Sequence, residues 1–148
     1  MSLFSRLRGQ PKPQNTVAKA VLTPAVSTMI ADGSVDDSEL AQLSNVVSFS
    51  PIFFQLDKNG LTGLVKEVIS EIQAKGHDAT IQAAATGLSP ALCETALCFA
   101  ARIALADGRL DEGEKASLAQ TGHHMNISQD AFGKILDVVI MMQRGPNA

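Results

Sequence analysis

The chain has 148 residues, of which 45% are hydrophobic and 18% charged, and its formal net charge is −3 at pH 7. This length and composition are typical of one folded domain with a hydrophobic core, and they exclude a disordered or strongly charged chain. Aromatic residues make up 4% of the chain, and Trp and Tyr are absent. The few aromatic and scattered basic residues argue against binding of nucleic acid, which requires clustered Lys and Arg.

Residues 1–14 are basic and are interrupted by Gly9, Pro11 and Pro13. We expect a flexible N-terminal lead-in here, because a short terminal segment of this kind is poorly ordered unless it is held against the rest of the domain. The alternative is one amphipathic turn, built around Leu3, Phe4 and Leu7, that touches a membrane surface or a partner. Residues 15–148 are then expected to form a single helical domain.

Hydrophobic residues recur at helical spacing from residue 15 onward. The first predicted helix covers about 15–32, with Pro24 either kinking it or starting a new segment capped by Thr23. A second predicted helix begins at Asp36. Ser50–Pro51 is typical of a cap and a first helical position, so a short helix is predicted to follow it. A longer helix is expected over about 61–75, ended by a glycine.

The second half of the chain repeats these signals. Asp78 is expected to cap an Ala-rich helix, and Ser89–Pro90 to open an apolar helix that runs to about residue 107. That apolar stretch is too short for a membrane span and is predicted to be the buried central helix. Further helices are predicted after Asp111 and Ser128. Since no segment alternates as a strand does, the predicted fold class is all-α, a compact bundle of seven to eight helices.

One acidic segment occurs twice, 75 residues apart, as IADGSVDDSE at 30–39 and LADGRLDEGE at 105–114. Each copy follows an apolar helix and precedes an amphipathic one, so the sequence predicts an internal pseudo-repeat of helix hairpins. Gly33 and Gly108 allow the positive φ that ends a helix. Val35 and Leu110 are expected to pack beneath the turns.

Local capping explains part of this motif. Asp36 and Asp111 are predicted N-caps, and Glu39 and Glu114, three residues later, complete two capping boxes. These four acids therefore need no ligand, because acids in a first helical turn are also favoured by the helix dipole.

Asp32 and Asp107 are different, because they fall in the last turn of a helix, where the dipole disfavours a carboxylate by about 0.3–1 kcal/mol. Each could accept amide hydrogens from its own turn, or both could face a cation. With no His or Cys nearby, the oxygens suit Ca²⁺ or Mg²⁺. If the hairpins pack about a pseudo-two-fold axis, their acids meet at one site. The candidate metal ligands are Asp32, Asp36, Glu39, Asp107, Asp111 and Glu114.

Each copy contains an Ala-Asp-Gly turn, then an apolar residue, and a Glu seven positions after the Asp. Together with residues 50–53 and the helix opened by Ser89–Pro90, this pattern resembles the TerB-like family of bacterial tellurite-resistance operons. The resemblance extends over about residues 16–143. The departure is Gly113, which weakens the second helix start.

The resemblance implies a cytoplasmic, internally repeated helical domain without enzymatic activity, associated with tellurite resistance and stress responses and binding a divalent metal through its acidic residues. It also implies protein partners in a stress-response or membrane-associated complex, and we include a homodimer among the arrangements expected. The alternative is a metal-independent module that contacts a partner or a membrane complex through its acidic surface.

Four other groups are expected to be structural. Asp57 opens a turn and not a calcium loop, because the later positions of an EF-hand lack the required ligands. His123 and His124 suit a helix C-terminus. Cys93 and Cys98 are expected to be reduced and unreactive. Met141–Met142 is expected to fill the core.

Overall fold

The computed structural model describes residues 13–31, 35–106 and 110–148. These ranges contain seven α-helices, one 3₁₀ helix and no strand, which confirms the predicted all-α class. The elements are α2 (Pro13–Met29), α3 (Asp37–Val47), η1 (Pro51–Phe53), α4 (Lys58–Lys75), α5 (His77–Thr86), α6 (Pro90–Ala104), α7 (Glu112–His124) and α8 (Gln129–Met142).

The helices begin where short polar side chains can accept backbone hydrogens. Asp36, Ser50, Ser89, Asp111 and Ser128 all act as the expected N-caps. One further cap was not predicted: the Asp57 carboxylate accepts the Gly60 N–H at 2.7 Å, so α4 starts at Lys58, earlier than expected.

The predicted cap of α5 is wrong. The N-cap is Gly76, whose φ of 90° suits glycine, and no side chain bonds to the helix start there. Asp78 lies inside the first turn of α5 and bonds to α7 instead. The Asp78 side chain, which the local sequence assigns to a helix cap, therefore makes a long-range contact with α7.

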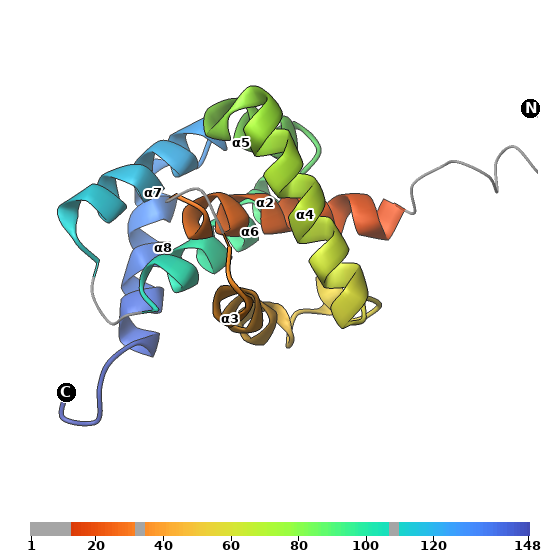
Figure 1. Cartoon of the computed structure of the whole chain (residues 1–148). Helices are drawn as coiled ribbons and strands as arrows, with labels where there is room; N and C mark the ends of the chain where they lie inside the picture. Colours follow the sequence, from red (N-terminus) through yellow and green to blue (C-terminus); the bar gives the residue numbers. More distant parts are fainter. Residues whose placement is uncertain (1–12, 32–34, 107–109) are drawn as a thin grey trace, which may run out of the picture.

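Two helices form the centre of the molecule, α2 and α6, which pack against each other. Figure 1 shows α4 and α5 on one side of this pair, α7 and α8 on the other, and α3 below. Pro24 does not divide α2, which is continuous through it. Thr23 donates its hydroxyl back to the Lys19 carbonyl at 2.8 Å and does not cap a new segment.

The buried side chains form two apolar clusters, and α6 contributes to both. The first lies mainly among α2, α3, α4 and α6, and Val35 packs against it. The second lies among α6, α7 and α8, and Leu110 packs against it. The apolar residue of each acidic segment therefore packs into the core, as expected. None of the helices in the described part of the chain is long and apolar enough to cross a membrane.

The end of α8 departs from expectation. This helix buries Ile135, Leu136 and Val139, but Met141 and Met142 remain 49% and 57% exposed. The prediction that these two methionines fill the core is wrong: both lie in the last turn of α8, past Val139, the last residue that this helix buries.

Candidate functional site

The two acidic segments border one pocket of about 580 Å³. The ends of α2 and α6 form part of its wall, and the starts of α3 and α7 form the rest. The correspondence is regular, since α2 and α6 end at Met29 and Ala104, and α3 and α7 begin at Asp37 and Glu112, each 75 residues apart. The polar lining residues are Thr28, Glu39, Gln42, Asp111, Glu114 and Ser117.

The carboxylates of this pocket also start the helices. Asp36 accepts the Glu39 N–H at 2.7 Å, and Glu39 accepts the Asp36 N–H at 3.2 Å, which completes the first capping box. Asp111 accepts the Glu114 N–H at 2.7 Å, but the Asp111 N–H makes no return bond to the Glu114 side chain, so the prediction of a second capping box is wrong. Because each of these side-chain hydrogen bonds uses one carboxylate oxygen, capping does not by itself exclude a second role for Glu39 or Asp111.

The six predicted ligands fall into three groups. Glu39, Asp111 and Glu114 line the pocket, so both hairpins contribute to it. Asp36 caps α3 and is not among the lining residues. Asp32 and Asp107 lie outside the described residues, as do Gly33 and Gly108. Because α2 and α6 end at Met29 and Ala104, three residues before these acids, the prediction that the acids fall in a last helical turn is wrong.

The pocket's donor chemistry suits a hard cation, because its titratable lining residues are carboxylates and its other polar groups are hydroxyls and an amide. Among the residues that the structure describes, however, no three His, Cys, Asp or Glu side chains are grouped closely enough to hold a metal ion. The described carboxylates alone therefore do not complete a cation site, and any such site requires further ligands.

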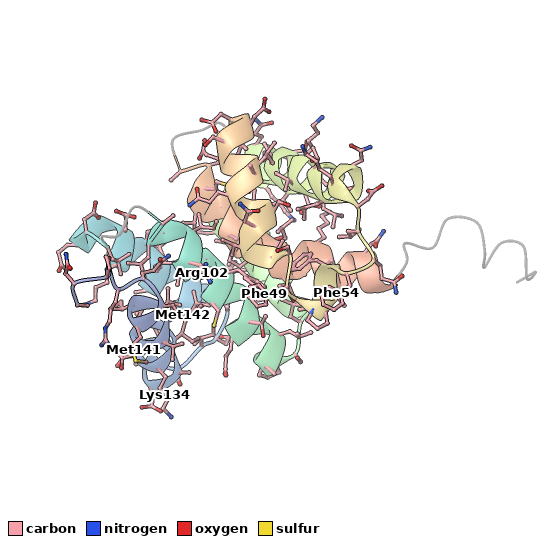
Figure 2. All side chains as sticks on the ribbon, turned by 90° about the horizontal axis from the view of Figure 1, so that it is seen from below. Phe49, Phe54, Arg102, Lys134, Met141 and Met142 are labelled. Atoms are coloured by element: carbon pink, nitrogen blue, oxygen red, sulfur yellow. The ribbon has the colours of Figure 1, made fainter. Side chains whose placement is uncertain are left out.

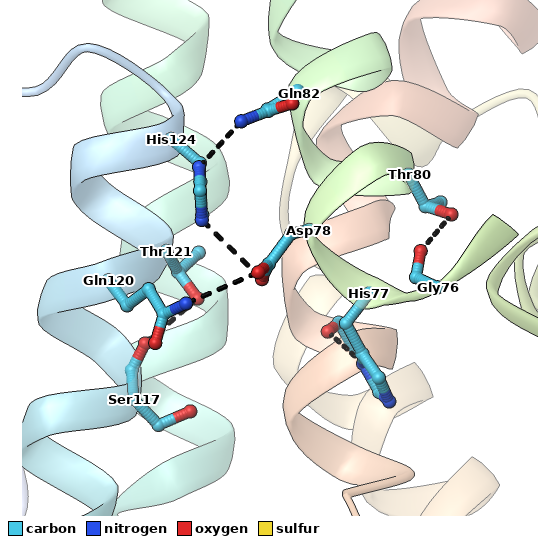
Figure 3. Close-up of polar contacts among 10 residues, drawn as sticks. Gly76, His77, Asp78, Thr80, Gln82, Ser117, Gln120, Thr121 and His124 are labelled. Carbon is cyan, nitrogen blue, oxygen red and sulfur yellow. Dashed lines mark hydrogen bonds and ion pairs between the residues drawn. The ribbon is translucent and has the colours of Figure 1, made fainter.

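A polar bridge joins α5 to α7 beside this pocket (Figure 3). His124 Nε2 lies 3.4 Å from one oxygen of Asp78, and the Gln120 amide donates to the other at 3.2 Å. The second ring nitrogen of His124 lies 2.8 Å from the Gln82 amide nitrogen. The bridge borders a smaller cavity of about 230 Å³ that shares Thr28, Ala31 and Ser117 with the acidic pocket.

Sequence reasoning missed this bridge, because it assigned His124 to the end of α7 alone. A signal was present: Asp78 and Gln82 are four residues apart on α5, as are Gln120 and His124 on α7. Such spacing places two polar side chains on one helix face, so two complementary faces could have been paired.

His77 holds the start of α5 to α2. Its Nδ1 lies 2.7 Å from the Ser27 hydroxyl oxygen, and Ser27 is buried. The helix that carries Asp78 is thereby fixed against the central helix α2.

The two cysteines are free thiols, as expected. Burial raises the pKa of Cys93 and of Cys98, and the negative charge of Glu94 raises both further. A raised pKa lowers the thiolate fraction near neutral pH, so neither residue has the character of a catalytic nucleophile.

Comparison with known proteins gives one match. No curated protein and no solved structure matches the chain. The family model described as tellurite resistance protein TerB matches residues 18–137, a range that includes the central helices, both acidic segments and the pocket between them. The chain therefore belongs to the TerB family.

Proposed function

We propose that this chain is a non-enzymatic TerB protein of the cytoplasm that acts in tellurite resistance or a related stress response and binds a divalent cation between its two acidic turns. The observation that carries the proposal is the shared pocket. Glu39 comes from the first hairpin, and Asp111 and Glu114 come from the second.

Asp32 and Asp107 are the ligands that we propose to complete the site, on the strength of their place in the sequence. A cation would offset the unfavourable interaction of these acids with the negative ends of the preceding helices. Ca²⁺ commonly takes about six to eight oxygen ligands and Mg²⁺ about six. Several carboxylates and water molecules would therefore share the coordination shell of the ion.

Calorimetric titration of Ca²⁺, Mg²⁺ and Mn²⁺ into the full chain tests this proposal, together with thermal unfolding. We expect heat of binding and a raised unfolding temperature, since an ion that binds only the folded state stabilises it by about 2.7 kcal/mol at 100 times its Kd. Asp107→Asn should weaken binding by about tenfold or more. The matched control is Asp130→Asn, which removes an exposed acid of α8.

The proposal fails if millimolar ion gives neither heat nor a thermal shift with the wild-type chain. It also fails if Asp107→Asn binds as tightly as Asp130→Asn does.

A second function is favoured by the capping geometry. Asp36 and Asp111 each bond to a backbone N–H, and the described residues contain no complete metal cluster. The acidic turns would then recognise a basic partner without metal. Capture of a basic protein that weakens with salt and persists in chelator would support this function, whereas loss of capture in chelator would contradict it.

A further inference from the structure

A second surface of the molecule is apolar and lies away from the acidic pocket. We call it the Phe–Met face and define it by Phe49, Phe54, Val138, Met141 and Met142, all at least 49% exposed, together with Arg102. Figure 2, seen from below, shows Phe54, Phe49, Arg102, Met142 and Met141 in that order across this side. The family match ends at residue 137, so the α8 part of the face lies beyond it.

The fold holds this face in place. On α8, Val138, Met141 and Met142 have the spacing of one helix face, which borders the face that buries Ile135, Leu136 and Val139. The Phe49 ring packs edge-on against Phe99 of α6, with ring centroids 6.3 Å apart. Phe49 is thus positioned by an aromatic contact and still exposes 65% of its surface.

Arg102 lies one helical turn after Phe99 on α6, between the phenylalanines and the methionines of the face. Its Nε is buried and has no hydrogen-bond partner, and its guanidinium forms no salt bridge with any residue in the described ranges. The buried Nε is closed to a docked partner, so any contact falls to the outer nitrogens of the guanidinium, which suit a carboxylate. A partner that complements Arg102 therefore brings a negative charge.

We propose that the Phe–Met face docks an amphipathic helix of another protein, which places an apolar stripe on the methionines and Phe49 and a carboxylate against Arg102. Exposed methionine and aromatic side chains are typical of surfaces that bind amphipathic helices, because methionine adapts to different apolar shapes. The carboxylate supplies the charge that complements Arg102.

The same charge disfavours other occupants. Residues 1–12 of the chain contain Arg6, Arg8 and Lys12 and no acid, so they carry the same sign as Arg102. A second copy docked by two-fold symmetry would bring the two Arg102 side chains towards each other. Binding to an anionic membrane, which attracts clustered basic residues, is tested separately with vesicles below.

The test is selection of a display library of helical peptides on the immobilised full chain. The library randomises an apolar stripe and the charges beside it. We expect the selected peptides to combine the stripe with Asp or Glu, and to lose binding to a Met141→Asp/Met142→Asp variant. Both substitutions are at exposed positions, and thermal unfolding verifies that the variant is folded. Lys66→Gln, an exposed change on α4, which carries no residue of this face, is the control and should bind as the wild type does.

A double-mutant cycle then isolates the charge contact. Replacing the selected peptide's acid by Gln should weaken binding to the wild type about tenfold and binding to Arg102→Gln hardly at all. The proposal is overturned if no peptide is enriched, if basic peptides are enriched, or if binding survives in Met141→Asp/Met142→Asp. It is also overturned if the double variant abolishes self-association in sedimentation or binding to phosphatidylglycerol vesicles, since either result gives the face a different occupant.

Discussion

The second helix of each acidic hairpin begins at an Asp N-cap, but the two helices differ in how they are buried. α3 buries Leu43, Val46 and Val47, whereas α7 buries Leu118, Thr121 and Gly122 at the positions 75 residues later. Two valines of the first copy thus correspond to a threonine and a glycine in the second. The helix starts are alike in the two segments, but the second helix buries less apolar surface.

Polar contacts supplement the packing of α7. Its Gln120 and His124 both reach Asp78 on α5, and Gly122 lets the helix come close to Phe132, which a Cβ at that position would meet at 3.4 Å. From this difference we expect the acids of α3 to sit on a firmly held helix and those of α7 on one that opens more readily.

Truncation of the buried leucines should give the largest effect. Leu118→Ala and Leu43→Ala should each lower the free energy of unfolding by about 2–5 kcal/mol. Leu118 is the one large apolar side chain that α7 buries, so its loss should also release α7 locally. Hydrogen exchange should then accelerate in α7 of Leu118→Ala, while α3 stays protected in Leu43→Ala because Val46 and Val47 remain. If α3 in Leu43→Ala lost as much hydrogen-exchange protection as α7 in Leu118→Ala, the proposed difference between the two helices would be contradicted.

Removal of the caps should have a smaller effect. Asp36→Ala and Asp111→Ala should each cost about 0.5–2 kcal/mol, measured by urea denaturation. We expect Asp111→Ala to cost more, because Gly113 already weakens the start of α7 and Glu39 can still bond to the backbone N–H of residue 36. Asp→Asn at each position retains a capping oxygen and serves as the control. A larger loss of unfolding free energy in Asp36→Ala than in Asp111→Ala would contradict this prediction.

The bridge between α5 and α7 should contribute least. The Asp78 side chain is 58% exposed, so a cycle of Asp78→Ala and His124→Ala should show a coupling of only about 0.2–1 kcal/mol. High salt should reduce this coupling. Faster hydrogen exchange confined to α7 in Asp78→Ala would support a role in holding that helix, and unchanged exchange there would argue against one.

Sequence reasoning succeeded where structure depends on near neighbours. Ser89, Asp111 and Ser128 start helices through bonds to the residue three positions later, so their roles could be predicted from spacing alone. The apolar face of α3 followed from its helical period for the same reason.

Sequence reasoning failed where contacts between distant helices decide the position of a side chain. Asp78 could cap its own helix or bond across to α7, and only the packing of α5 on α7 selects the second. Met141 and Met142 have core-like composition, but the orientation of α8 leaves them exposed. The shared pocket likewise depends on the arrangement of four helices, which the duplicated motif suggested only on the condition of two-fold packing.

The most direct test of the central claim is the number of cations bound per chain, measured by native mass spectrometry during Ca²⁺ titration. If the two turns form one site, the chain binds a single ion, and Glu39→Gln and Glu114→Gln each weaken that same binding event by about tenfold or more. Asp37→Asn and Glu112→Gln, neighbouring acids that do not line the pocket, should leave it unchanged. Two ions per chain, with each Gln variant losing one and retaining the other, would contradict the claim.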